Sequence, residues 1–228
     1  RPYYDRDGDY KLVSEGGSIK FGVPFSEVDT VFFGVGLERF TFQPGSTFAD
    51  ATPQAYRDYF NCNFDATSNT ITGCSDDSKW GIPVTIGWAR DDRDSALVPT
   101  KGRLQRANVE WGAGGDLKYL KSSYQLQQYF PLSKQYTLAL NGEVGYAKAL
   151  GGSTYPIFKN FYAGGLGSIR GFEQNSLGPR DAVTEAALGG TKKAIFNAEL
   201  STPFPGAGND RTLRLYGFFD AGNVFSDR

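Results

Sequence analysis

The chain has 228 residues and a net charge of −1, with 29 glycines, 13 tyrosines, 18 phenylalanines, two cysteines and no histidine. The near-neutral charge, without any cluster of Lys and Arg, excludes a nucleic-acid-binding surface, and the usual zinc sites cannot form from this composition. No run approaches the roughly 18 apolar residues that a membrane-spanning helix needs. Many turn formers and aromatic residues instead predict one large β domain.

Apolar residues alternate with polar or small residues along eight segments, and no helical periodicity recurs. The predicted strands lie at 19–25, 30–38, 82–89, 103–111, 120–130, 136–146, 194–201 and 213–221. Several have about 9 to 11 residues, which is the length that crosses a bilayer at a tilt. The segments therefore predict either a soluble β-sandwich or a transmembrane β-barrel.

The two architectures differ in where the apolar face points. A sandwich buries that face in a core, whereas a transmembrane barrel turns it toward lipid and lines its lumen with polar and small residues. Barrels also carry aromatic girdles at both membrane interfaces. Aromatic residues do recur near the predicted strand ends, at Phe25, Trp88, Trp111, Phe130, Tyr136 and Tyr146. This recurrence favours the barrel.

Connection lengths point the same way. The connections at 26–29, 131–135 and 203–210 are short, whereas those at 43–79 and 149–191 are long. Outer-membrane barrels have short periplasmic turns and longer extracellular loops. The alternation therefore places both long loops at the extracellular end, although 91–102 is longer and 112–116 shorter than it predicts.

The first long loop contains both cysteines. Cys62 and Cys74 lie twelve positions apart in a polar stretch without metal-binding or nucleophilic neighbours. We predict a local disulfide formed in an oxidising compartment, worth about 3 kcal/mol in the chain-entropy model. The alternative is a pair of unrelated thiols.

The second long loop contains the stretch FYAGGLGSIRGF at 161–172, in which Arg170 is the only basic residue. Its glycines let the backbone fold tightly and present one side chain. An arginine held in such a loop is expected to meet a carboxylate in fork geometry. Glu199 and Asp220 alternate with apolar neighbours on predicted strands, so both would point into a barrel lumen. A solvated loop arginine is the alternative.

This stretch, followed by LGPR at 177–180, resembles the signature of the outer-membrane β-barrel assembly and transport family. In that family a long external loop carries a Val/Ile-Arg-Gly-Phe/Tyr motif and folds back into the lumen. The matching residues here are Ile169, Arg170, Gly171 and Phe172. Most of the chain takes part in the resemblance, including PTKG at 99–102, AELSTPF at 198–204 and FFDAGNVF at 218–225. The resemblance implies that Arg170 pairs with Glu199 and Asp220.

The resemblance also implies an all-β, antiparallel transmembrane β-barrel of sixteen strands, of which this chain supplies about eight. Residues 1–228 would then be part of one C-terminal barrel domain, a fragment without the family's POTRA domains or its first and last strands. Because an open arc of strands leaves two unpaired edges, which lipid does not tolerate, we expect the arc to pack against other copies or to continue into further strands.

The implied function is that of the central barrel subunit that folds and inserts β-barrel proteins into the outer membrane of a Gram-negative bacterium. No catalysis, metal or cofactor is expected, because strand templating needs only backbone hydrogen bonds. The expected partners are outer-membrane lipid, unfolded outer-membrane proteins and accessory assembly lipoproteins, but no nucleic acid. The alternatives are a two-partner secretion transporter, a translocation-assembly relative, a diffusion porin and a soluble β-sandwich binding module.

Overall fold

The computed structural model of the protein describes residues 10–44, 52–65, 67–68, 70–206 and 213–226. The strands are β1 (Lys11–Pro24), β2 (Asp29–Gln43), β3 (Cys62–Asp65), β4 (Thr70–Cys74), β5 (Ser78–Asp91), β6 (Gly102–Gly115), β7 (Tyr119–Pro131), β8 (Thr137–Ala149), β9 (Lys192–Pro203) and β10 (Arg214–Phe225). The helices are α1 (Gln54–Tyr59) and the 3-10 helix η2 (Ile157–Lys159). Neither of these helices is long and apolar enough to cross a membrane.

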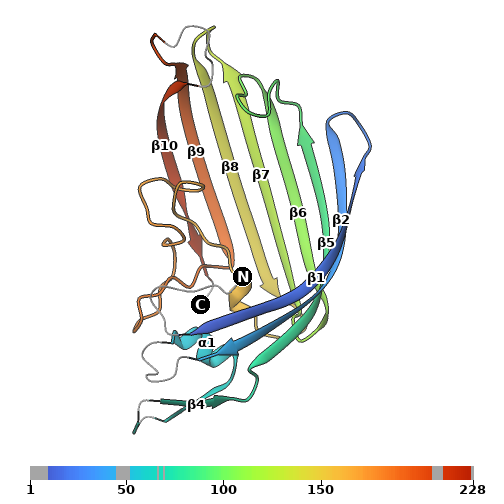
Figure 1. Ribbon diagram of the computed structural model, residues 1–228, viewed down its shortest axis with the longest axis vertical. Helices are drawn as coiled ribbons and strands as arrows, with labels where there is room; N and C mark the ends of the chain where they lie inside the picture. Colours follow the sequence, from blue (N-terminus) through green and yellow to red (C-terminus); the bar gives the residue numbers. More distant parts are fainter. Residues whose placement is uncertain (1–9, 45–51, 66, 69, 207–212, 227–228) are drawn as a thin grey trace.

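Eight of the strands form one curved antiparallel sheet in the order β1-β2-β5-β6-β7-β8-β9-β10 (Figure 1). The all-β antiparallel fold with eight long strands is therefore confirmed. Within the described residues the sheet is an open arc with β1 and β10 at its edges. The strands contain 12 to 15 residues, more than predicted, because backbone pairing continues beyond the clean alternation. In β1, for example, Lys11 still pairs with Gln43 and Ser18 with Gly36.

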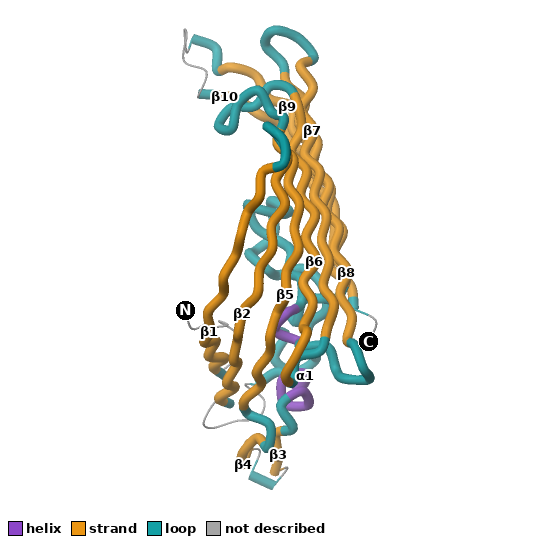
Figure 2. Tube along the Cα trace, turned by 90° about the vertical axis from the view of Figure 1, so that its right-hand side faces the viewer, coloured by secondary structure: helices purple, strands orange, loops and turns teal. Residues whose placement is uncertain are grey.

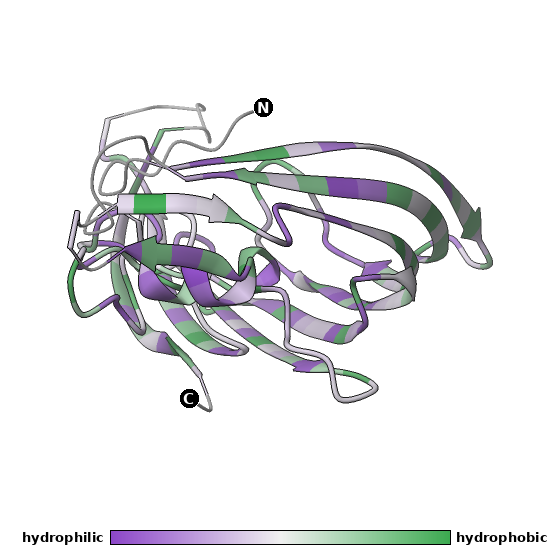
Figure 3. Ribbon diagram, turned by 90° about the horizontal axis from the view of Figure 1, so that it is seen from below, coloured by the Kyte–Doolittle hydropathy of each residue, from purple (hydrophilic) through white to green (hydrophobic). Residues whose placement is uncertain are grey.

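The two faces of the sheet differ in polarity, and Figure 3 shows hydropathy alternating along the strands. Large apolar side chains stand exposed on the convex outer face; Phe21, Val144, Phe196 and Phe219 are 63%, 54%, 44% and 62% exposed. A sandwich would bury these residues against a second sheet. In the described part of the chain they instead form an exposed apolar surface, as in a barrel wall that faces lipid.

The long connections lie together at one end of the sheet (Figure 1). We call residues 44–77 the cysteine loop and residues 150–191 the arginine loop. The cysteine loop contains α1 and the β3–β4 hairpin, which the sequence did not predict. Cys62 and Cys74 face each other across this hairpin and are joined by a disulfide bond.

The short connections lie at the opposite end, except that between β6 and β7 at 116–118, which lies beside the arginine loop, where the Lys118 carbonyl accepts the backbone N–H of Leu150 at 3.0 Å. The predicted turn at 203–210 falls partly on residues 207–212, outside the described residues. The connection at 92–101 is longer than parity predicted, but it is compact because one carboxylate organises it. Asp94 accepts the backbone N–H groups of Thr100 at 2.8 Å and Lys101 at 3.1 Å.

An aromatic cluster fills the space where the two long loops meet the sheet. Its buried members are Tyr10, Phe42, Tyr56, Phe60, Ile157 and Leu188. The rings of Phe42 and Phe60 stack at 4.7 Å. Polar and small residues were expected on the concave face, but near the long loops this face also carries buried aromatic rings. Packing against the loops shields these rings from water, which explains the difference.

Candidate functional site

The arginine loop lies against the concave inner face of the sheet (Figures 1 and 2). Gly164, Gly165 and Gly171 have φ values of 110°, 92° and 88°, so the backbone makes tight bends that L side chains rarely allow. Ile169 is 2% exposed and packs in a buried cluster with Phe161, Ala163, Ile195 and Val224, among others. The cluster fixes the backbone beside Arg170 against β9 and β10.

Arg170 binds the carboxylates of both Glu199 on β9 and Asp220 on β10. Its Nη1 lies 2.7 Å from Glu199 Oε2, and its Nη2 lies 2.7 Å from Asp220 Oδ1. Its Nε donates to Asp220 Oδ2 at 2.7 Å, and its backbone N–H donates to the same oxygen at 2.9 Å. The contact with Asp220 therefore has the bidentate fork geometry of a strong arginine–carboxylate pair. We call these three residues the Arg170 anchor.

The surroundings hold the acids of this anchor in place. The guanidinium lies over the Phe218 ring at 3.7 Å, a favourable cation–π arrangement. Asn197 donates to Asp220 Oδ1 at 2.9 Å and to the Ser168 carbonyl at 2.7 Å. The Asp220 side chain is only 3% exposed, whereas that of Glu199 is 34% exposed. Asp220 is therefore the partner that depends most on Arg170, since a buried charge needs a counter-charge.

The hydrogen bonds of Arg170 raise the pKa of its guanidinium, first through Asp220 and then through Glu199. The group therefore stays charged throughout the accessible pH range.

A row of side-chain amides continues from this site along the inner face. Asn141 on β8 donates to Asn197 at 2.7 Å, and Gln125 on β7 donates to Asn141 at 3.0 Å.

Other motif residues lie outside the ion pair. Phe172 is 54% exposed. In the LGPR segment, Arg180 donates to the carbonyls of Glu185 and Ser176 at 2.8 and 3.0 Å, so it stabilises the loop's own backbone. Gly178, with a φ of 105°, backs directly onto Val224 of β10, where any Cβ would overlap the valine side chain. This segment therefore packs the loop against β10 and takes no part in the ion pairs of the Arg170 anchor.

A second set of charges joins the same loop to the other side of the sheet. Lys159 Nζ lies 2.8 Å from the Glu38 carboxylate on β2 and 3.0 Å from Glu110 Oε1 on β6. Tyr119 donates its hydroxyl to Glu110, and Lys121 Nζ donates to the Lys159 carbonyl at 2.7 Å. We call Lys159, Glu38 and Glu110 the Lys159 anchor.

Sequence reasoning missed this anchor. Lys159 stands in an ordinary stretch, IFKN, and its acids lie 121 and 49 positions away. The available signal was that Glu38 and Glu110 occupy inward positions of predicted strands, as Glu199 does. Among the described residues, no three His, Cys, Asp or Glu side chains gather to form a possible metal site. The chemistry that both anchors offer is thus the fixing of a loop by charge pairs.

Comparison with known proteins gives this arrangement a family. Residues 3–228 match the model of the Omp85 superfamily domain. The chain is 40% identical over 226 residues to the outer membrane protein assembly factor BamA of Neisseria meningitidis serogroup B, covering 96% of this chain and 27% of that protein. It is 33% identical over 147 residues to a SAM50-like protein of Schizosaccharomyces pombe, covering 62% of this chain and 30% of that protein.

A solved structure agrees in fold. The crystal structure of BamA from Haemophilus ducreyi lacking POTRA domains 1–3 superposes with a TM-score of 0.83 and 22% sequence identity, covering 99% of this chain and 44% of that chain. The matched region spans only 27% of the length of the Neisseria protein and 30% of the length of the Schizosaccharomyces protein. From the match of the family model over nearly its whole length, the chain belongs to the Omp85 superfamily.

Proposed function

We propose that this chain forms part of a barrel that folds and inserts β-barrel proteins into the outer membrane of a Gram-negative bacterium. Support comes from a relative named as an outer membrane protein assembly factor, 40% identical over 226 residues. The apolar outer face of the sheet suits contact with outer-membrane lipid. The proposed partners are therefore that lipid, unfolded outer-membrane proteins and accessory assembly lipoproteins.

The observation that carries the proposal is the Arg170 anchor. A diffusion porin keeps a water-filled channel, whereas here the arginine loop lies on the inner face and its arginine is occupied by two carboxylates. The anchor joins the loop to β9 and β10 together, so it opposes sliding of these strands past each other. In an assembly protein, such a stiffened wall would support the strand edges at which substrate chains pair through backbone hydrogen bonds.

A two-partner secretion transporter or a translocation-assembly relative is the second candidate. The combination of FYAGG at 161–165 and LGPR at 177–180 is the feature that favours assembly. Genetic complementation separates the two functions. We expect the full-length protein to restore folded outer-membrane proteins to a bacterium depleted of its own assembly factor, which a dedicated secretion transporter would not do.

The role of the anchor is tested in the same strain with Arg170→Ala and Arg170→Lys. Arg170→Ala strands the buried Asp220 charge, so we expect the yield of folded outer-membrane proteins to fall by about tenfold or more. Arg170→Lys should restore only part of the activity, because an ammonium cannot make the fork contact. Arg106→Ala, which removes an exposed arginine from β6, is the matched control. Full activity of Arg170→Ala, with the loop still seated in the structure of that variant, would refute the proposed role.

A further inference from the structure

The Lys159 anchor sets one cation against two carboxylates. Lys159 contacts Glu38 and Glu110, Lys121 donates to the Lys159 carbonyl, and the Lys159 side chain is only 14% exposed. The Glu38 and Glu110 side chains are 17% and 22% exposed. Buried cations without counter-charges are strongly disfavoured. The two acids therefore give Lys159 a defined position on the wall rather than a random surface contact.

Both the side chain and the backbone of Lys159 are held. Its carbonyl accepts hydrogen bonds from Lys121 at 2.7 Å and from the Tyr155 hydroxyl at 3.0 Å. On one side the ammonium lies over the rings of Phe40 and Tyr119, at 5.6 and 5.3 Å. The 3-10 helix η2 is thereby fixed at its last residue, because both the ammonium and the carbonyl of Lys159 are hydrogen-bonded.

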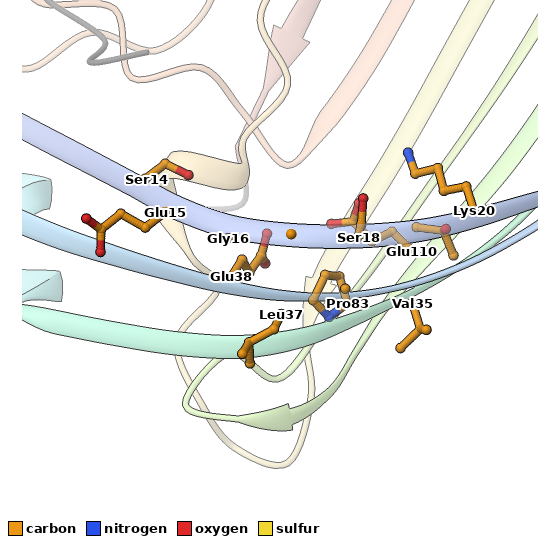
Figure 4. A pocket seen from close by; sticks show the side chains of 13 residues that line it. Ser14, Glu15, Gly16, Ser18, Lys20, Val35, Leu37, Glu38, Pro83 and Glu110 are labelled. Carbon is orange, nitrogen blue, oxygen red and sulfur yellow. The ribbon is translucent and has the colours of Figure 1, made fainter.

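On the other side of the cluster the wall is lined mainly by small side chains. A pocket of about 340 Å³ lies beside the two acids, and Figure 4 shows the side chains that line it. Small residues of β1 and β2 line much of it, among them Ser14, Gly16, Ser18 and Gly36. These residues provide little side-chain surface on which the loop could pack. On this side the ion pairs join the loop to the wall, while Phe158 of the same segment stacks on Phe40 of β2 with 4.2 Å between ring centroids.

The two anchors use different parts of the sheet. The Lys159 anchor binds β2 and β6, whereas the Arg170 anchor binds β9 and β10. In the sheet order, β7 and β8 lie between these two pairs of strands. The arginine loop thus crosses the concave face from one wall to the other, and its two anchoring cations, Lys159 and Arg170, are eleven positions apart in the sequence.

We propose that Lys159 is a second positioning residue, which holds residues 155–161 against β2 and β6 independently of Arg170. The loop is thereby a two-point brace across the lumen, and release of one anchor leaves the other half seated. This inference rests on the proposed function only in placing the loop inside a barrel. It does not depend on which proteins are assembled.

Hydrogen–deuterium exchange on the full-length protein in lipid tests the proposal. Lys159→Met keeps the aliphatic stem but removes the charge, so exchange in residues 155–161 should rise by about tenfold while that in residues 164–177 changes little. Arg170→Ala should give the converse pattern. Lys148→Met is the control, because it removes an exposed lysine at the end of β8 from which the arginine loop begins, and it should alter neither segment.

If Lys159→Met does not fold, the double variant Glu38→Gln with Glu110→Gln removes the same ion pairs from the other side and should loosen the same segment. Unchanged exchange in residues 155–161, or equal loosening of both segments by Lys159→Met, would overturn the inference. Assembly activity is measured on the same samples. If the wild-type protein assembles nothing while the two exchange patterns appear, the proposed function fails and the two-point brace stands.

Discussion

The two anchors of the arginine loop differ in the geometry and the exposure of their ion pairs. Arg170 is a planar fork that matches one carboxylate in two places, and its main partner, Asp220, is 3% exposed. Lys159 is a compact charge shared by two acids that are 17% and 22% exposed. An arginine fork fixes orientation, whereas an ammonium fixes only position. We therefore propose that Arg170 fixes the orientation of the loop tip, and that Lys159 fixes the position at which the loop begins to cross the sheet.

The two anchors should also differ in energy. Removing one partner of a buried ion pair costs about 3 to 5 kcal/mol, because the other charge is stranded. The two acids of the Lys159 anchor are more exposed than Asp220, and both also accept the Tyr119 hydroxyl, so the loss of one partner should cost about 1 to 3 kcal/mol. Single-residue variants can therefore distinguish the two anchors by the size of the stability loss as well as by the segment that loosens.

The largest effect is expected from Asp220→Asn. The amide keeps the shape but removes the charge that meets the fork and the backbone N–H of Arg170. We expect the free energy of unfolding in lipid vesicles to fall by about 3 kcal/mol. Glu199→Gln should cost less, since that side chain is 34% exposed.

Glu27→Gln, at an exposed turn position, is the matched control for Asp220→Asn. It removes a carboxylate at the opposite end of the sheet from the loop. If Asp220→Asn were as stable as this control, or if Glu199→Gln were the more damaging change, the ranking of the two acids would be wrong.

An intermediate effect is expected at Gly145 on β8, where the loop passes between its anchors. The Phe161 ring packs on this glycine, and a Cβ there would lie 2.7 Å from the ring carbon Cζ. Gly145→Val should therefore push the loop from the wall and cost about 1 to 3 kcal/mol. Gly142→Val is the control, since no atom lies within 4 Å of a Cβ at that position of the same strand. Equal stability of the two variants would show that the loop is not in close contact with β8.

The Arg170 half of this comparison was accessible from the sequence, and the Lys159 half was not. Glycines at 164, 165, 167 and 171 mark Arg170 as a presented side chain, and period-two alternation identifies the inward face on which Glu199 and Asp220 stand. Lys159 has no such local mark. Its pairing depends on β2 and β6 being brought to the loop by the curvature of the sheet, which no local pattern encodes.

The fold divides in the same way. Alternation identified the eight strands of the sheet, because each strand has one apolar face. It did not reveal the first half of β1, where Lys11 to Ser18 are mostly polar or small and pairing with β2 decides the structure. Nor did it reveal the aromatic cluster, because Phe42 and Phe60 become buried only when two distant loops pack together.

The smallest effect concerns the junction between the two loops, which tests whether either anchor depends on the cysteine loop. Asp181 is 6% exposed and accepts the backbone N–H of Gln54 at 2.8 Å. Burial alone would raise the pKa of Asp181, but hydrogen bonds from the N–H groups of Thr184, Gln54 and Val183 outweigh it and lower the pKa below its usual 3.8. The stabilisation is therefore complete above about pH 4 and is lost as the pH falls through the lowered pKa.

We expect exchange in residues 52–60, corrected for intrinsic rates, to rise by less than about tenfold between pH 5 and pH 2.5. Asp181→Asn should show the raised exchange already at pH 7, with no further titration from this site. In that variant, residues 155–161 and 164–177 should exchange as in the wild type, because the charges that hold them lie on the sheet. If either segment loosens with the junction, that anchor is supported by the cysteine loop and the two-point brace is incomplete without it.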